Sequence, residues 1–172
     1  MKQLANTIDV YACMVKKMFM ENFTSSTEFT LRPATAEDAP VIRHIISMVQ
    51  INPMNLSWRR FVLAVDRTGQ IIGTGQVKPH ADGSLELASI AVLPDWRGKG
   101  IARLIIEYLL EQYPGRLYLT CRAPLGPLYQ KFGFQAINAN EMPPYFKRIS
   151  RLIHLFNRLF HQPDRLLVMR RN

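Results

Sequence analysis

The alternation of apolar and polar positions along this chain of 172 residues predicts a series of short β-strands. Segments that alternate, or that form short runs of apolar and β-branched residues, cover 29–32, 61–65, 71–77, 85–92, 117–121, a stretch from Phe134, and 166–169. Glycine-containing turns at 66–69 and 80–83 connect the second, third and fourth of these segments. We therefore expect three consecutive antiparallel strands in the middle of the sequence.

Apolar residues at three- and four-residue spacing predict helices between the strands. Thr35 and Asp38 suit the start of a helix that runs through 41–49, and Pro114-Gly115 ends a helix over 101–113. Asn52-Pro53-Met54-Asn55 breaks the pattern. Further helices are expected over 8–23, 125–132 and 145–161. Composition and periodicity alone predict a mixed α/β domain.

The most informative segment joins the apolar run 85–92 to the helix 101–113, and it reads Val92-Leu93-Pro94-Asp95-Trp96-Arg97-Gly98-Lys99-Gly100-Ile101-Ala102. Its two glycines allow the backbone to approach a ligand without a Cβ clash. The helix start presents unpaired N–H groups and partial positive charge, and Arg97, Lys99 and Arg103 add full charges. These features predict a phosphate-binding turn.

This segment resembles the acyl-CoA-binding motif of the GNAT acetyltransferase superfamily, whose core reads Arg/Gln-x-x-Gly-x-Gly/Ala. Residues 97–102 match that core fully, and Val92-Leu93-Pro94 matches the Val-x-Pro that precedes it. The resemblance covers about residues 30–137 well and the last strand loosely. It implies an α/β (α+β) fold with a mixed, mostly antiparallel central sheet flanked by helices, from which this chain departs by an extra helix before the last strand.

The same resemblance implies acetyl-CoA as co-substrate, an amine acceptor and no metal. The strand before the turn is expected to offer free backbone groups to the pantetheine arm, and one of its N–H groups to polarise the thioester carbonyl. The residues expected to bind acetyl-CoA are Ile90, Ala91, Val92, Arg97, Gly98, Lys99, Gly100, Ile101, Ala102 and Arg103.

Two side chains are candidates for proton transfer. Tyr129 lies in Tyr129-Gln130-Lys131-Phe132-Gly133-Phe134, which resembles the family's Tyr-x-Lys-x-Gly-Phe, where the tyrosine is commonly the acid toward the leaving thiolate. Glu86, a lone carboxylate in an apolar strand, is the candidate base, and the resemblance implies that such a base acts through a water. The alternatives are a core tyrosine that packs the short helix and an exposed strand carboxylate. Ser89 is a weaker candidate for orienting water or substrate, and His80 is a turn residue held in reserve as a base.

Length and composition predict a single domain. The resemblance implies that residues 29–172 form a single GNAT-like domain after an N-terminal extension, 1–28. Cys13 and Cys121 are far apart and in no metal-binding pattern, which favours a reducing, cytoplasmic location. We expect no secretory signal and no transmembrane segment.

The net charge is +9, and +6 of it lies in residues 145–172. Residues 144–161 are an inserted basic amphipathic helix, which we interpret mainly as a docked helix with a solvated face. Alternatives are a wall of the acceptor pocket, a homodimer contact or an anionic surface. Arg122 stands where many GNAT enzymes have an asparagine near the carrier arm; it is interpreted as a contact to phosphate or to an acidic acceptor, or as the cap of a strand end.

The sequence as a whole predicts an N-acetyltransferase that moves an acetyl group from acetyl-CoA to a primary amine, directly, within a ternary complex. One alternative is a non-catalytic acetyl-CoA-binding sensor or scaffold. The other, a basic protein that binds nucleic acid or a membrane surface, lacks a zinc-finger or RNA-binding signature, and no nucleic acid is expected. The identity of the acceptor and the oligomeric state stay open.

Overall fold

The computed structural model of the chain describes residues 28–49, 56–160 and 166–172, with side chains of the last helix described as far as Leu152. Three predictions lie outside these residues: the helix over 8–23, the break at 52–55, and nearly all of the extension 1–28. The division into an extension and a single domain stays a prediction.

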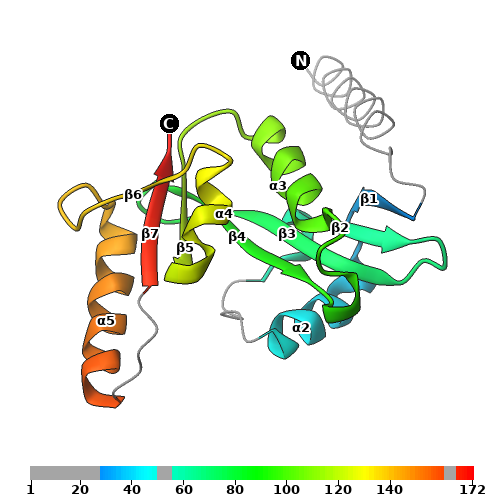
Figure 1. The fold of residues 1–172 in the computed structure, drawn as a ribbon, viewed down its shortest axis with the longest axis horizontal. Coiled ribbons are helices and arrows are strands. Elements are labelled where there is room, and N and C mark those ends of the chain that lie inside the picture. Colours follow the sequence, from blue (N-terminus) through cyan, green and yellow to red (C-terminus); the bar gives the residue numbers. More distant parts are fainter. Residues whose placement is uncertain (1–27, 50–55, 161–165) are drawn as a thin grey trace, which may run out of the picture. The chain divides into compact units, whose positions relative to one another are not determined.

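Strands and helices alternate along the described residues much as the sequence predicts (Figure 1). The strands are β1 Phe29–Pro33, β2 Phe61–Asp66, β3 Ile71–Pro79, β4 Leu85–Val92, β5 Leu117–Arg122, β6 Gln135–Ala136 and β7 Leu166–Arg171. The α-helices are α2 Ala39–Met48, α3 Ile101–Gln112, α4 Gly126–Gln130 and α5 Pro144–Phe160. Most boundaries fall within a few residues of the predicted ones.

The strands form a seven-stranded sheet in the order β1-β2-β3-β4-β5-β7-β6. The pairs β1–β2, β5–β7 and β6–β7 are antiparallel, and β4–β5 is parallel. The predicted mixed, mostly antiparallel sheet with flanking helices is therefore confirmed. The position of the last strand, between β5 and the two-residue β6, is a finding that the order of elements along the sequence does not contain.

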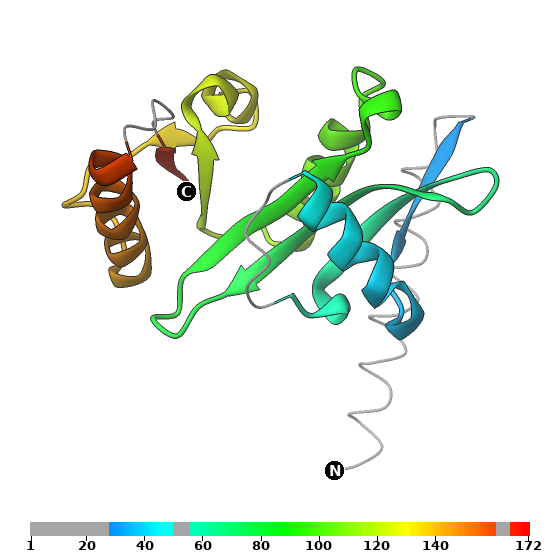
Figure 2. The same cartoon turned by 90° about the horizontal axis from the view of Figure 1, so that it is seen from below.

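One compact unit comprises residues up to 74 together with 91–108, and it holds β1, β2, the start of β3, α2 and the first turns of α3. Figure 2 shows α2 lying over its strands. The apolar face of α2 packs with β2 in a core whose buried members are Ala34, Ile42, Ile45, Ile46, Phe61, Leu63, Val65, Ile71 and Ala91. The helical and strand periodicities thus meet in one cluster.

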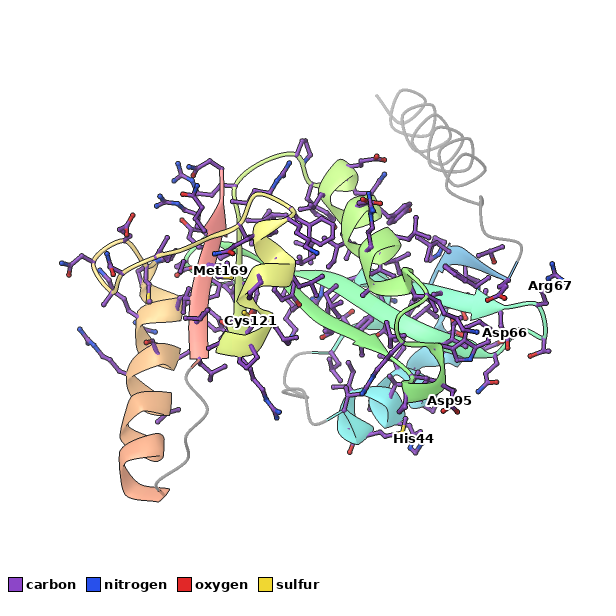
Figure 3. All side chains as sticks on the ribbon, in the orientation of Figure 1. His44, Asp66, Arg67, Asp95, Cys121 and Met169 are labelled. Atoms are coloured by element: carbon purple, nitrogen blue, oxygen red, sulfur yellow. The ribbon has the colours of Figure 1, made fainter. Side chains whose placement is uncertain are left out.

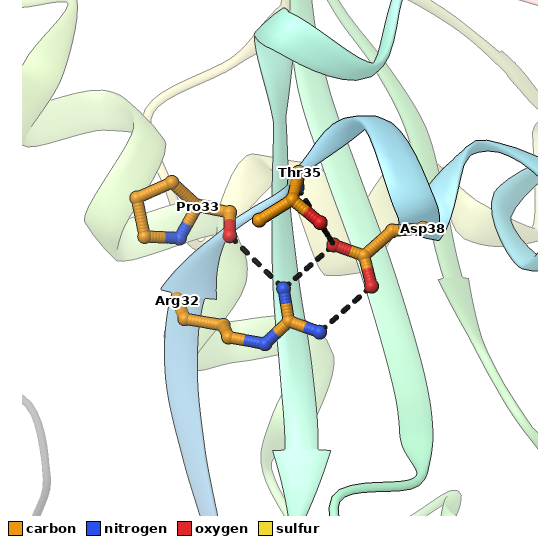
Figure 4. Close-up of polar contacts among 4 residues, drawn as sticks. All are labelled: Arg32, Pro33, Thr35 and Asp38. Atoms are coloured by element: carbon orange, nitrogen blue, oxygen red, sulfur yellow. Dashed lines mark hydrogen bonds and ion pairs between the residues drawn. The ribbon is translucent and has the colours of Figure 1, made fainter.

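Asp38 connects the end of β1 to the start of α2 in this unit. Its carboxylate accepts two hydrogen bonds from the Arg32 guanidinium, at 2.7 and 2.8 Å (Figure 4). It also accepts from the Thr35 backbone N–H at 2.7 Å and the Thr35 hydroxyl at 3.0 Å. The bonds from Arg32 and Thr35 hold the pKa of Asp38 well below its ordinary value, against the opposing effect of burial.

Gly73 in β3 allows α3 to lie close to the sheet. A Cβ at this position would come 2.9 Å from Ile101 Cγ2, 3.1 Å from Ile105 Cδ1 and 3.3 Å from the Ala91 carbonyl oxygen. Ile101 and Ile105 are both buried, so they have little space to retreat. A side chain at Gly73 would therefore displace the start of α3.

The second compact unit comprises residues 75–90 and 109–172. Its strands β5 and β7 pair from Leu117 with Arg171 to Arg122 with Leu166. The thiol of Cys121 lies 3.9 Å from the Met169 sulfur across that pair (Figure 3). A further cluster buries Phe146 of α5 against Tyr118 and Val168. The first turns of α5 are thus anchored on this part of the sheet.

No helix in the described part of the chain combines the length and the apolar character needed to cross a membrane.

We expect Asp38→Asn to lower the free energy of unfolding by about 2 kcal/mol at pH 7, because charge-assisted hydrogen bonds are lost. Since the native pKa of Asp38 is depressed, its contribution is full above the unfolded pKa of about 3.9 and fades as the pH falls toward the native pKa. Urea unfolding at pH 7 and pH 3 measures this. Glu37→Gln, an exposed neighbour, is the control; an equal effect of both substitutions at pH 7 would contradict the assignment.

We expect Gly73→Ala to lower the free energy of unfolding by about 1–3 kcal/mol, because the added methyl group overpacks the contact with Ile101 and Ile105. Gly115→Ala is the matched control, since a Cβ there meets nothing within 4 Å and the backbone is not left-handed. Thermal and urea unfolding of both variants compare them. Equal stability of the two variants would mean that α3 adjusts without cost.

Candidate active site

The turn between β4 and α3 has the backbone geometry that the glycines of the motif imply. A short 3-10 turn, Pro94–Trp96, precedes it, and Gly98 and Gly100 have φ values of +79° and +82°. The Leu104 amide donates to the Gly100 carbonyl at 3.0 Å, which makes this the first bond of α3. The amides of residues 101–103 therefore precede the first helical donor, the Leu104 amide, and they lie at the positive end of the helix dipole.

The three cations of the motif are already engaged at the surface of the first unit. Arg97 Nε donates to the Val92 carbonyl at 3.3 Å. Lys99 Nζ lies 4.4 Å from the centre of the Trp96 ring and 3.5 Å from Glu28. Arg103 donates to Glu107 at 2.7 Å along the helix. Exposed pairs of this kind contribute little and can be exchanged for a ligand, so the fixed part of the turn is its backbone.

β4 is distorted just before this turn. Ser89 is buried and has φ +58°, in the left-handed region that residues other than glycine rarely adopt. Its hydroxyl accepts a hydrogen bond from Gln76 Nε2 at 2.9 Å, both side chains being buried. In the described residues, β4 pairs with β5 at Glu86 and Tyr118, ahead of Ser89. Ile90, Ala91 and Val92 follow Ser89 directly.

In the second unit, Glu86 is neither exposed nor alone. Its Oε2 lies 3.0 Å from His80 Nε2, and the side chains of His80 and Glu86 retain 6% and 13% of their exposure. The His80 ring stacks on Tyr145, with ring centres 3.5 Å apart and planes 16° apart. Phe146 lies edge-on to the same ring, at 5.7 Å. A buried acid–imidazole pair is therefore enclosed by aromatic rings at the start of α5.

Asp82, in the hairpin turn between β3 and β4, connects that turn to α5. Its Oδ2 accepts the Tyr145 backbone N–H at 2.7 Å, in the first turn of the helix, and its Oδ1 accepts the Ser84 amide and hydroxyl at 3.0 and 2.6 Å. Pro144 precedes Tyr145 as the first helical residue. One carboxylate thus closes the hairpin and satisfies an amide at the helix start.

Burial and charge act in opposite directions on these groups. Burial raises the pKa of Glu86, and its interactions with His80 and Lys78 oppose that rise. The pKa of Asp82 is lowered, because hydrogen bonds from Ser84 and Tyr145 outweigh its partial desolvation. Burial and the nearby Glu86 and Asp82 carboxylates raise the pKa of Tyr145. The site favours a neutral Tyr145 phenol beside a carboxylate that can accept a proton.

Tyr129 lies on α4, and the residue as a whole is only 8% exposed. Its ring meets Phe134 edge-on at 6.2 Å. Burial raises its pKa to about 12, with a smaller contribution from Cys121. Burial likewise raises the pKa of the Cys121 thiol to about 11. Both groups therefore keep their protons at neutral pH.

The structure brings Glu86 and His80 together, and it adds Tyr145 and Asp82, which the sequence analysis did not select. The pattern that could have revealed them is the aspartate at the hairpin tip together with a proline–tyrosine helix start, but their pairing spans 63 residues and is not visible in sequence. Arg122 is exposed, ends β5 and precedes the 3-10 turn Ala123–Leu125. Among the described residues, no group of three or more His, Cys, Asp or Glu side chains could hold a metal ion.

Comparison with known proteins finds a match to one domain family. The family model described as an acetyltransferase (GNAT) domain matches residues 57–136. This match confirms the resemblance to the GNAT superfamily and includes β4, the 92–102 turn and Tyr129. A search of curated proteins gives no match.

Solved structures share the fold. N-acetylglutamate synthase from Neisseria gonorrhoeae, complexed with coenzyme A and N-acetyl-glutamate, has a TM-score of 0.66 at 18% identity, and the match covers 83% of this chain and 34% of that one. Rv2747 from Mycobacterium tuberculosis, in a complex that includes CoA, has a TM-score of 0.63 at 19% identity, covering 83% and 98%. The ribosomal-protein-S18-alanine N-acetyltransferase from Escherichia coli has a TM-score of 0.57 at 18% identity, covering 83% and 92%. The chain thus spans about a third of the synthase, and these similarities show the fold.

Proposed function

We propose that this protein is an acyl-CoA-dependent N-acyltransferase that moves an acetyl group from acetyl-CoA to a primary amine by direct transfer. The observation that carries the proposal is the complete motif 97–102, found in a GNAT match and folded as a left-handed glycine turn that ends in the first turn of α3. Solved structures of similar fold that contain CoA support it.

In this proposal the backbone of residues 98–103 holds the pyrophosphate of the co-substrate. The preorganised amides offer hydrogen bonds and the helix dipole adds positive potential, with Arg97, Lys99 and Arg103 as exchangeable cations. The distortion at Ser89 supports a role for Ile90, Ala91 and Val92 in presenting main-chain groups to the pantetheine arm. Any protein N–H aimed at the thioester oxygen would stabilise the developing negative charge.

Proton transfer in this proposal falls to Glu86 and Tyr129. The acceptor arrives as an ammonium group with a pKa near 10.4, so a base must remove a proton before attack. Glu86 is buried with a raised pKa, which makes its carboxylate a better proton acceptor than an exposed one. Tyr129 keeps its proton at neutral pH and supplies it to the leaving sulfur. The protonated Cys121 thiol is a poor nucleophile, which supports direct transfer over an acyl-cysteine.

The cytoplasmic location, a primary amine as the acceptor and a homodimer are likewise proposals. The reducing location rests on cysteine usage. Primary amines of small molecules, of protein N-termini and of lysine side chains are the acceptors to be compared.

We expect Gly98→Ala and Gly100→Ala each to weaken acetyl-CoA binding at least tenfold, because a left-handed alanine costs about 1–2 kcal/mol and the turn relaxes away from its binding geometry. Gly69→Ala is the matched control: it also has a positive φ, +86°, with nothing near its Cβ, but lies in the β2–β3 turn. Isothermal titration calorimetry measures the affinities. Equal affinity of all three variants would contradict a role for this turn, and no binding by the unmodified protein would refute the proposed function.

We expect Tyr129→Phe and Glu86→Gln each to lower kcat by about 10²–10⁴-fold while the affinity for acetyl-CoA stays unchanged, because each removes one proton transfer. A thiol-release assay over a panel of amines measures turnover. Retained turnover in both variants would overturn both roles, and loss in Tyr129→Phe alone would place the base elsewhere. Binding of acetyl-CoA without thiol release by the unmodified protein would identify a non-catalytic sensor.

A further inference from the structure

Sequence reasoning treats His80 as a turn residue, but the structure gives it a built environment. Its Nε2 faces the Glu86 carboxylate at 3.0 Å, and the ring lies flat against Tyr145 and edge-on to Phe146. Backbone bonds between His80 and Ser84 and between Gly83 and His80 close the hairpin beneath it. The imidazole is held on three sides, by β4, by α5 and by its own turn.

This arrangement determines what each ring nitrogen can do. When Glu86 is ionised, its carboxylate requires a donor, so Nε2 carries the hydrogen and Nδ1 keeps the lone pair. A carboxylate that fixes the tautomer of an imidazole and stabilises its protonated form is the arrangement that makes histidine an effective base. In such an arrangement the carboxylate acts through the imidazole rather than on the acceptor itself.

We propose that His80 and Glu86 act as one proton-accepting pair in the amine transfer, with His80 Nδ1 receiving the proton and Tyr145 as the positioning residue of the His80 ring. This inference rests on the proposed function and deepens it by replacing a single carboxylate base with a pair. It also assigns α5, through Tyr145 and its Asp82 contact, a place in the acceptor half of the reaction.

The step balances in protons and electrons. One N–H bond of the acceptor ammonium breaks and its proton passes to His80 Nδ1, directly or through one water, while the electron pair stays on nitrogen. That pair forms the bond to the thioester carbon, the C–S bond breaks, and the sulfur takes a proton from the Tyr129 phenol. The second proton of the attacking nitrogen returns to the Tyr129 oxygen. The proton on His80 leaves to water.

The charges around the imidazole agree with this role. Glu86 on β4 and Asp82 in the hairpin carry negative charge toward it, and Lys78 on β3 carries positive charge toward Glu86. The Tyr145 phenol is neutral. Tyr118 packs at a tilt against Phe146, with ring centres 5.2 Å apart. A proton taken up by His80 therefore forms an ion pair with Glu86 inside an enclosure of rings.

The first test is the pH profile of kcat/KM in the thiol-release assay, with an amine that the unmodified protein accepts. His80→Gln keeps a donor near Glu86 but cannot titrate, so we expect kcat to fall by about 10²–10⁴-fold with the acidic limb lost and the KM for acetyl-CoA unchanged. Arg151→Ala, on an exposed position of α5, is the control and should change neither quantity. Activity of His80→Gln within threefold of the unmodified protein, with its acidic limb intact, would overturn the inference.

The second test separates positioning from mere structure. Tyr145→Leu removes the stacked ring, and Tyr145→Phe restores it without the hydroxyl. We expect the leucine variant to lower kcat by about tenfold and to shift the acidic limb, and the phenylalanine variant to restore both. NMR reports the geometry without activity, because the ring current of residue 145 shifts the His80 imidazole protons in the unmodified and phenylalanine proteins and not in the leucine variant.

Different results would refute the proposed enzyme and the proposed His80–Glu86 pair. A protein that binds acetyl-CoA but releases no thiol with any amine refutes the enzyme and the pair together. An active protein in which Tyr145→Leu loses the ring-current shift but keeps its rate and pH profile refutes the positioning role alone. An active protein in which Glu86→Gln is impaired but His80→Gln is not shows that Glu86 acts without its partner.

Discussion

The close approach of α3 to β3 at Gly73 is the contact on which the candidate anion site depends. Ile101 and Ile105 occupy the space where a side chain at residue 73 would lie, and both are buried. The first turn of α3 is thereby fixed against the strand, and the left-handed Gly98 and Gly100 bring the chain into it. Donors that are held in place before a ligand arrives lose no reorganisation energy on binding, which is why a backbone turn can serve as a site.

The central feature of the second unit is a buried carboxylate. Glu86 in an apolar strand would be costly without a partner, and His80 at the end of β3 supplies one. The same hairpin satisfies an amide of α5 through Asp82, and Phe146 buries the first turn of that helix. Arg148 and Arg151 of α5 remain exposed. In its described residues, α5 is thus a docked helix with a basic outer face. The first turn that docks it also encloses His80, through Tyr145 and Phe146.

Local patterns predicted the elements well, because strand alternation, helical spacing and turn glycines are encoded over a few residues. They also selected the turn at 92–102 and Glu86. They did not predict that β7 lies between β5 and β6, that Asp82 binds the start of α5, or that His80 faces Glu86 beneath Tyr145. These are pairings of distant or oppositely oriented segments, and no single-sequence periodicity specifies which of several compatible surfaces meet. Ser89 at φ +58° is a further example, since serine gives no local sign of a left-handed backbone.

Burial raises the pKa of both Tyr129 and Glu86, yet the two groups have opposite roles in the proposed reaction, one as acid and the other in the base. A raised carboxylate pKa improves a base, whereas a phenol at about 12 is a reluctant acid toward a thiolate, for which the cysteine reference is about 8.5. Complete transfer between two such groups would cost about 5 kcal/mol. The phenol proton must therefore move as the C–S bond breaks. The attacking nitrogen, which is still acidic in the collapsing intermediate, returns a proton to the phenol oxygen. That coupling requires the acceptor's first proton to have left already, which is the task of the His80–Glu86 pair.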